Sequence, residues 1–236
     1  NGKTYPLYLF FHGGGETGTL YDNEFQLYHG GQKHMNAVDN GTFDGFLLYP
    51  QVSWNSKVFS LNQRNAIRDL IENFLIPQVQ VDPFRVVVNG LSGGGGATWN
   101  FLFENPTLVA AAAPISAASI TGNAQLVQQS FTPIWLFQGA LDTKPPPVNA
   151  RGMNNAAKAA GNNFKYTEFP DRGHDCWNQS WGQADYFPFL KRAHKANPWA
   201  LFGRTEFCTE ETINVTIGVT AGFDAYEWRK NDEIII

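Results

Sequence analysis

Short runs of consecutive apolar residues alternate with segments of helical periodicity along most of the chain. Six β-rich runs are expected to form strands, at residues 7–11, 46–49, 86–88, 110–115, 134–137 and 164–169. The first five are apolar throughout, as is typical of strands buried on both faces of a parallel sheet, and the more polar sixth is expected near an edge. The alternation predicts an α/β fold, with a mostly parallel sheet and helices on both of its faces.

Four helices are expected from the same pattern, at residues 62–76, 93–104, 148–160 and 181–195. The first has apolar residues at helical spacing and is expected to end at Pro77, because proline disrupts a helix interior. Gly161 is expected to close the third helix. Pro188 is expected to kink or break the fourth.

The pattern changes after Pro198, where apolar and polar or small residues alternate with a period of two from Ile213 to Val219. This period predicts a half-buried antiparallel strand, and residues 225–228 a second one. We therefore expect a boundary near Gly203, with an α/β domain over residues 1–203 and the start of a β-rich module over 204–236. The chain begins with Asn rather than Met and stops in an apolar run, which predicts a fragment truncated at both ends.

Composition narrows the possible functions. Hydrophobic residues make up 43% of the chain and charged residues 16%, as in a globular protein. The net charge is −4 without any Lys/Arg-rich run, so no nucleic-acid partner is expected. No apolar run approaches the ~18 residues needed to cross a bilayer, so no membrane segment is expected. Cys176 and Cys208 do not have the spacing of a zinc site, and we expect neither a metal nor another cofactor.

The segment Gly90-Leu91-Ser92-Gly93-Gly94 lies between an expected strand and an expected helix. This is the context of a nucleophile elbow, in which a serine occupies a tight turn. Its neighbours two before and two after must be small so that strand and helix can pass each other. Alternatively, the five glycines within Gly90–Gly96 form only a flexible turn.

An acid and a histidine follow the serine in the chain order that a hydrolase of this kind requires. Asp142 lies beyond the expected strand at 134–137, and His174 beyond the one at 164–169. In the usual mechanism the histidine takes the serine proton and the acid orients the imidazole. Asp171 and Asp175 are rival acids, but we favour Asp142 because it follows a strand of its own. The remaining histidines His29, His34 and His194 are expected in loops or on helix surfaces, without partners or a catalytic role.

An oxyanion hole is expected from His12-Gly13-Gly14-Gly15-Glu16, which follows the first strand. Gly14 is expected to donate one backbone N–H, with Gly13 as the alternative, and Gly93 the other. The same glycines also spell G-x-G-x-x-G, a dinucleotide-binding pattern. We disfavour that interpretation because residues 19–44 show no convincing crossover helix and no strand that ends in an acidic residue.

At these residues the chain resembles the esterase and predicted-peptidase branch of the α/β-hydrolase superfamily, which includes feruloyl esterase-like and polyhydroxybutyrate depolymerase-like proteins. Besides the elbow, the resemblance over residues 1–202 rests on the segments 9–16, 49–51, 81–85, 112–115 and 173–178. It implies a triad of Ser92, Asp142 and His174, with Gly14 and Gly93 as the oxyanion hole. The chain departs from the family at Gln138, where a histidine is often found, and in its proline-rich segment 145–147.

Residues 207–228 resemble the start of an immunoglobulin-like repeat that is common in secreted multidomain proteins of Bacteroidetes. This second resemblance implies a secreted or cell-surface bacterial enzyme. In that setting Cys208 could pair with Cys176, or the two could be unrelated free thiols.

The sequence predicts a serine esterase that cleaves carbohydrate-linked or polymeric esters. Trp54 and Trp177 lie in segments expected to rim the pocket, where they either bind substrate or simply pack. One alternative is a serine peptidase of the same fold, although such peptidases usually carry an additional gating domain. The other is a silent polysaccharide-binding module, which an intact triad argues against.

Overall fold

The computed structural model describes residues 2–19, 24–53, 55–118, 123–202 and 207–235. A six-stranded sheet with the order β2-β1-β3-β4-β5-β6 forms its centre. Every neighbouring pair in it is parallel. Its strands are β1 (Tyr5–Phe11), β2 (Phe46–Leu48), β3 (Val81–Leu91), β4 (Val109–Ile115), β5 (Ile134–Gly139) and β6 (Phe164–Phe169). All six predicted strands are confirmed, and the more polar β6 lies at an edge.

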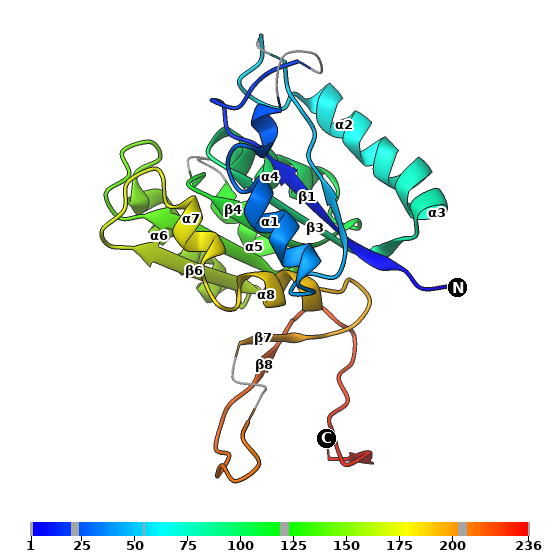
Figure 1. Cartoon of the computed structure of the whole chain (residues 1–236). Coiled ribbons are helices and arrows are strands. Elements are labelled where there is room, and N and C mark those ends of the chain that lie inside the picture. Colours follow the sequence, from blue (N-terminus) through cyan, green and yellow to red (C-terminus); the bar gives the residue numbers. More distant parts are fainter. Residues whose placement is uncertain (1, 20–23, 54, 119–122, 203–206, 236) are drawn as a thin grey trace.

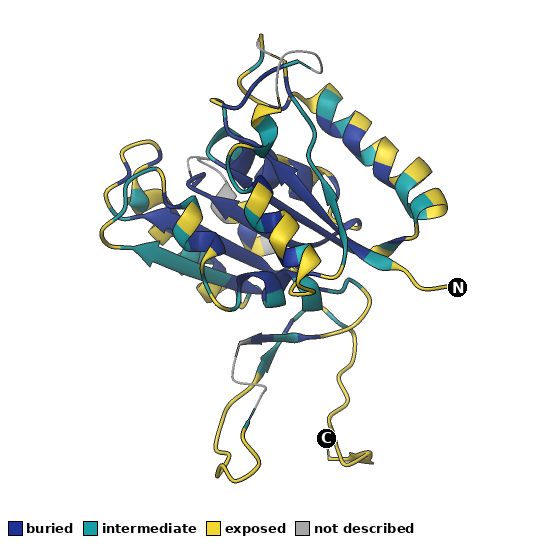
Figure 2. Ribbon diagram, viewed as in Figure 1, coloured by how far each residue is buried: buried dark blue, intermediate teal, exposed yellow. Residues whose placement is uncertain are grey.

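Helices cover both faces of this sheet, as predicted (Figure 1). The first face packs against α2 (Leu61–Leu70), α4 (Gly93–Glu104), α5 (Asn123–Gln129) and α6 (Pro147–Ala159). The second face packs against α1 (Gly31–Asp39), α7 (Trp177–Trp181) and α8 (Tyr186–Arg192). The two cores follow from the period of two in each strand, because in β1 the side chains of Leu7 and Leu9 enter one core and that of Tyr8 the other. The buried sheet between them is visible in Figure 2.

The helix predicted to end at Pro77 continues past it. A π-helical turn, η2 (Ile71–Leu75), follows α2, and α3 (Ile76–Val79) begins at the proline. The wider turn changes the hydrogen-bond register, as the N–H of Ile76 bonds to the carbonyl of Ile71 five residues back. This change of register comes just before Pro77, where it lets the chain stay helical through a residue that has no N–H to donate.

The helix predicted over residues 181–195 is also wrong in its bounds, because it is split into α7 and α8 before the proline. Pro188 is the third residue of α8, and the first intrahelical bond runs from the N–H of Phe189 to Asp185. The first four N–H groups of a helix lack intrahelical partners, so proline fits there without a kink. Two helices, α1 and α5, were not predicted. The presence of α1 corrects the expectation that residues 19–44 lack a crossover helix.

The C-terminal residues leave the α/β unit as an extended segment (Figure 1). Short antiparallel pairs join β7 (Ala200–Phe202) to β8 (Gly218–Val219), and β9 (Arg229–Lys230) to β10 (Glu233–Ile234). The strands predicted at 213–219 and 225–228 are thus wrong except at residues 218–219. The alternating apolar side chains of 213–217 are exposed, because no sheet face within the described part of the chain covers them. Gly203, the predicted boundary, lies outside the described residues.

His34 lies in the second core and not on a helix surface, so the expectation that it lacks partners is wrong. Its side chain is fully buried, with Nε2 3.2 Å from the Tyr8 hydroxyl and Nδ1 hydrogen-bonded to the Tyr49 hydroxyl. The Tyr8 hydroxyl donates in turn to Asn89 Oδ1 at 2.8 Å. Burial, helped by the charge of Lys33, lowers the pKa of His34 to about 3.

This pKa makes the stability of the fold depend on acidity. Below the ordinary histidine pKa of ~6.5 the unfolded chain binds a proton that the native His34 refuses until about pH 3. We expect the free energy of unfolding to fall with acidification in that window, by up to ~1.4 kcal/mol per pH unit from this group. Urea denaturation between pH 6.5 and 4 should show a shallower dependence for His34→Gln than for the wild type. His194→Gln is the control, and equal slopes in all three proteins would contradict the prediction.

Candidate functional site

Ser92 occupies the turn between β3 and α4, as the glycine pattern predicts. Its backbone has φ 53° and ψ −118°, a conformation that non-glycine residues rarely adopt. The Ser92 N–H donates to the carbonyl of Ile115 at 2.9 Å, which ties the turn to the end of β4. Ser92 is the N-cap residue of α4, so the serine lies at the positive end of the helix dipole.

The glycines on both sides of Ser92 are required by close packing. A Cβ on Gly90 would lie 2.7 Å from Thr98 Oγ1 and collide with the backbone of Gly94. One on Gly94 would collide with the carbonyl oxygens of Phe11 and His12. The predicted need for small neighbours two before and two after the serine is confirmed, and the alternative of a merely flexible turn is not supported.

We expect Gly94→Ala to destabilise the fold by ~1–3 kcal/mol or more, because the obstructing atoms belong to backbone and cannot rotate away. Gly96→Ala is the matched control in the same helix. Of the residues that the structure describes, none lies within 4 Å of a Cβ at that position, so alanine should raise stability by up to ~1 kcal/mol through helix propensity. Thermal denaturation of both variants checks the pair, and equal melting temperatures would contradict it.

The structure brings the side chains of Ser92, His174 and Asp142 into one hydrogen-bonded row. His174 Nε2 lies 2.8 Å from Ser92 Oγ, and His174 Nδ1 lies 2.9 Å from Asp142 Oδ2. The three residues come from the ends of β3, β6 and β5, which meet at one edge because the strands are parallel. An imidazole whose Nδ1–H donates to a carboxylate leaves Nε2 free to accept the serine proton.

Asp142 is held rigidly in this row. It is 4% exposed, and its carboxylate accepts hydrogen bonds from Gln138 Nε2 and the Lys144 N–H, each at 2.8 Å. The rival acids Asp171 and Asp175 are exposed to solvent, unlike Asp142. The Asp171 carboxylate pairs with Arg172, with Oδ2 3.5 Å from Nε. The geometry therefore favours Asp142 over both.

The loop that carries His174 is fixed by groups that the sequence did not single out. Ser116 has φ 51° at the end of β4, and its hydroxyl donates to the His174 carbonyl at 2.6 Å. Its oxygen also lies 3.3 Å from Cys176 Sγ. Burial raises the pKa of the Cys176 thiol, so this group stays protonated and packs in the second core. Cys176 and Cys208 are both free thiols in the structure.

The backbones of Gly14 and Gly93 face each other beside the serine. A Cβ added to Gly93 would lie 3.5 Å from the Gly14 nitrogen. A Cβ added to either glycine would lie within 3.2 Å of the Lys57 carbonyl oxygen. His12 fixes this loop, since its Nδ1 lies 2.7 Å from the Gly13 carbonyl and its Nε2 accepts from the Val52 N–H at 3.1 Å. Burial lowers the pKa of His12, which favours the neutral ring that this pairing requires.

Ser92 and His174 open onto a cavity of about 500 Å³. Its other lining residues are Val58, Gly93, Gly96, Ser116, Thr143, Lys144, Pro145 and Pro146. The predicted substrate contact Trp54 lies outside the described residues. Trp177 is not among the lining residues, but its ring lies edge-on to His174 with a centroid distance of 6.1 Å.

Two further histidines have partners, contrary to expectation. His29 Nε2 lies 3.6 Å from Glu16 Oε1, and its ring packs on Trp177. His194 accepts a hydrogen bond from the Ala196 N–H at 3.0 Å and stacks on Phe84. The ring contacts with Trp177 and Phe84 join segments that are distant in sequence, which no local pattern reveals.

Neither a metal centre nor a membrane helix is found in the part of the chain that the structure describes. There, no three or more His, Cys, Asp or Glu side chains cluster so as to hold a metal ion. Within the same residues, no helix has the length and apolarity to cross a bilayer.

Comparison with curated proteins finds two bacterial relatives, and no family model matches the chain. Both are named "Putative carboxymethylenebutenolidase". The relative from Salmonella typhimurium is 28% identical over 125 residues, and that from Escherichia coli O157:H7 is 28% identical over 127. Each alignment spans 50% of this chain and 44% of the relative, which is less than half of the relative's length.

Solved structures show the fold more clearly. A thermostable esterase superposes with a TM-score of 0.66 at 26% identity, over 81% of this chain and 56% of the esterase. A ferulic acid esterase superposes with a TM-score of 0.59 at 16% identity, over 80% of this chain and 85% of the esterase. The Pyrococcus horikoshii acylaminoacyl peptidase superposes with a TM-score of 0.61 at 16% identity, over 89% of this chain and 39% of the peptidase. The chain has the α/β-hydrolase fold, as predicted.

Proposed function

We propose that the chain is a serine hydrolase that cleaves carboxylic esters through an acyl-enzyme on Ser92. The observation that carries the proposal is the row Ser92–His174–Asp142, with hydrogen bonds of 2.8 and 2.9 Å, at the edge of an open cavity. A serine on a strained turn, a histidine that can accept its proton and a buried acid behind the histidine are the parts that acyl transfer requires.

In the first half of the proposed reaction, Ser92 Oγ attacks the ester carbonyl while its proton passes to His174 Nε2. The negative charge that develops on the carbonyl oxygen is stabilised by the N–H groups of Gly14 and Gly93. Asp142 stabilises the positive imidazole. The alkoxide then leaves as an alcohol with the proton from His174, and the acyl group remains on Ser92.

In the second half, a water molecule donates a proton to His174 Nε2 and attacks the acyl carbon. The bond between that carbon and Ser92 Oγ breaks, the proton returns to the serine, and the free acid departs. His174 acts in both halves, so each half begins with the neutral histidine in the tautomer that Asp142 selects and ends with the return of the proton from the imidazolium.

Esters are preferred over peptides as the proposed substrates. Among the structural comparisons reported above, the thermostable esterase has the highest identity, and the peptidase is matched over only 39% of its length. The cavity is open to solvent beside surface loops, which suits carbohydrate-linked or polymeric esters. A secreted or cell-surface location is part of the proposal and rests on the resemblance of residues 207–228 to repeats of secreted proteins.

The test is covalent labelling together with turnover. We expect the purified chain to hydrolyse p-nitrophenyl acetate and to react with a fluorophosphonate probe, with the adduct mapped to Ser92 by peptide mass spectrometry. A silent polysaccharide-binding module would do neither. Cleavage of peptide anilides as fast as simple esters would favour the peptidase.

A further inference from the structure

Four aromatic rings form a continuous row that starts at His174 and runs outward from the Ser92 cavity. Trp177 lies against His174, the rings of Trp177 and His29 have centroids 4.9 Å apart, and those of His29 and Tyr28 are 4.7 Å apart. The Tyr28 and Phe25 centroids are 6.4 Å apart. We call Phe25, Tyr28, His29 and Trp177 the aromatic row.

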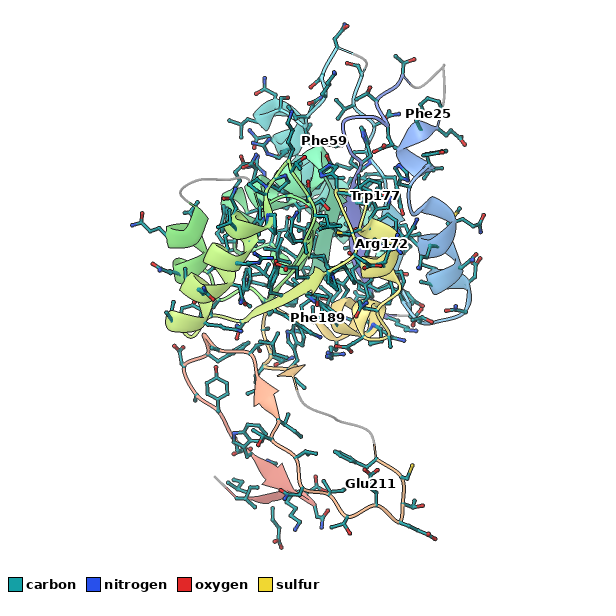
Figure 3. All side chains as sticks on the ribbon, turned by 90° about the vertical axis from the view of Figure 1, so that its left-hand side faces the viewer. Phe25, Phe59, Arg172, Trp177, Phe189 and Glu211 are labelled. Atoms are coloured by element: carbon teal, nitrogen blue, oxygen red, sulfur yellow. The ribbon has the colours of Figure 1, made fainter. Side chains whose placement is uncertain are left out.

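The row joins two segments that are far apart in sequence. Phe25 belongs to the short 3₁₀ helix η1 (Phe25–Leu27), and Trp177 is the first residue of α7, three residues after His174. Figure 3 shows both side chains on the same flank of the molecule. The inner end of the row is therefore attached to the loop that carries His174, whereas its outer end is open, with Phe25 46% and Tyr28 73% exposed.

A small pocket of about 150 Å³ lies at the outer half of the row, lined by Gly15, Glu16, Phe25 and Tyr28. The Glu16 side chain is buried, with its residue 8% exposed. Oε1 lies 3.6 Å from His29 Nε2, and the buried Oε2 has no hydrogen-bond partner among the described residues. Oε2 has no exposed surface, so a ligand in the pocket would hydrogen-bond to this largely buried carboxylate through Oε1. A carboxylate so far removed from water is costly without a donor, which points to a ligand that brings one.

The pocket adjoins the reacting centre through the backbone. Glu16 and Gly15 continue the loop of Gly14, and a Cβ on Gly13 would lie 2.7 Å from Glu16 Oε2. Glu16 therefore lies two residues from Gly14 in the chain, and Trp177 at the inner end of the row lies edge-on to His174.

The combination of rings and carboxylate selects the chemistry of the ligand. Aromatic faces pack on the C–H face of a sugar ring, and a carboxylate accepts hydrogen bonds from its hydroxyl groups. A purely apolar group would leave the carboxylate unpaired, and an anionic one would be repelled by it. We infer that the aromatic row and Glu16 form a subsite for a pyranose in the alcohol part of the ester, an inference that rests on the proposed function.

The experiment compares two substrates with the same acyl group, p-nitrophenyl acetate and acetylated xylo- or cello-oligosaccharides. Tyr28→Ala should raise KM for the preferred acetylated oligosaccharide by about 2- to 12-fold, the effect of one aromatic contact, while kcat/KM for p-nitrophenyl acetate stays unchanged. Phe74→Ala is the matched control, because Phe74 is 53% exposed and lies on the remote η2 turn. The control should behave as the wild type with both substrates.

A direct binding measurement separates this inference from the esterase proposal. Calorimetric titration of the Ser92→Ala protein with unacetylated oligosaccharide should give binding that is weakened 2- to 12-fold in Ser92→Ala/Tyr28→Ala. Absence of binding by both oligosaccharides, or equal affinities with and without Tyr28, would overturn the subsite. Equal loss of activity on both substrates in Tyr28→Ala would mean that the tyrosine is merely structural. Failure of the esterase proposal would instead appear as no hydrolysis of any ester with sugar binding intact.

Discussion

Ser92→Ala is expected to lower kcat for p-nitrophenyl acetate by about 10⁶-fold, the loss typical of removing the nucleophile of a triad. The substitution removes the oxygen that lies 2.8 Å from His174 Nε2 and is positioned at the cavity. Alanine tolerates the backbone conformation of Ser92 no worse than serine does, so the melting temperature should change little. Stopped-flow and steady-state hydrolysis, with fluorophosphonate labelling of the same preparations, measure the effect.

Ser116→Ala is the matched control. Ser116 also lines the cavity, but its hydroxyl is engaged by the His174 carbonyl at 2.6 Å and serves to position the loop. Removing one such hydrogen bond is worth ~0.5–1.5 kcal/mol, so activity should fall no more than about 12-fold. If Ser92→Ala retained wild-type turnover while Ser116→Ala lost it, the nucleophile would be misassigned.

The central sheet was predictable because its strands are buried on both faces. Burial of this kind demands continuous apolar runs, such as residues 7–11 and 134–137, and such runs are visible without any knowledge of their neighbours. The elbow was predictable for a related reason, since Gly90 and Gly94 are needed by backbone contacts that no other residue permits.

The failures arise where long-range packing or hydrogen-bond register decides the structure. A π-turn allows the helix to pass Pro77, and its register is not encoded in apolar spacing. Helix α1 has only three buried residues, Gly31, His34 and Ala37, so its apolar periodicity is weak. The alternation over residues 213–217 has the period of a strand, but a strand also needs a partner and a face to cover.

The candidate site divides in the same way. Ser92, Asp142 and His174 follow strand ends in the chain order of a known constellation, so their approach could be expected before their distances were measured. The groups that support the triad could not be predicted from the sequence. Ser116, for example, holds the His174 loop through a hydrogen bond to a residue 58 positions away. In the sequence Gln138 stands out only as a departure from the family that the chain resembles, whereas in the structure it donates to Asp142.

The support around Asp142 makes a strong prediction for Asp142→Asn, which is expected to lower kcat by about 10⁴-fold with little change in KM. In the wild type both carboxylate oxygens accept from fixed donors, Oδ1 from the Lys144 N–H and Oδ2 from Gln138 and His174. An asparagine must place its NH₂ group at one of these two positions. If the NH₂ group points toward Lys144, it faces the backbone N–H of that residue, so two donors oppose each other. In addition, the neutral amide no longer stabilises the imidazolium.

If the NH₂ group of the asparagine points toward His174 instead, it donates to Nδ1. The single imidazole proton then lies on Nε2, which can no longer accept the serine proton. This second orientation is assisted by Gln138, whose buried Oε1 has no hydrogen-bond partner among the residues that the structure describes and can accept from the new amide after rotation of the side chain. Asp175→Asn is the control, as Asp175 is exposed and follows His174 directly in the chain. It should retain activity within about threefold, in keeping with the small effects of surface substitutions. Loss of turnover in Asp175→Asn with turnover kept in Asp142→Asn would transfer the role of the acid to Asp175 and leave the serine mechanism intact.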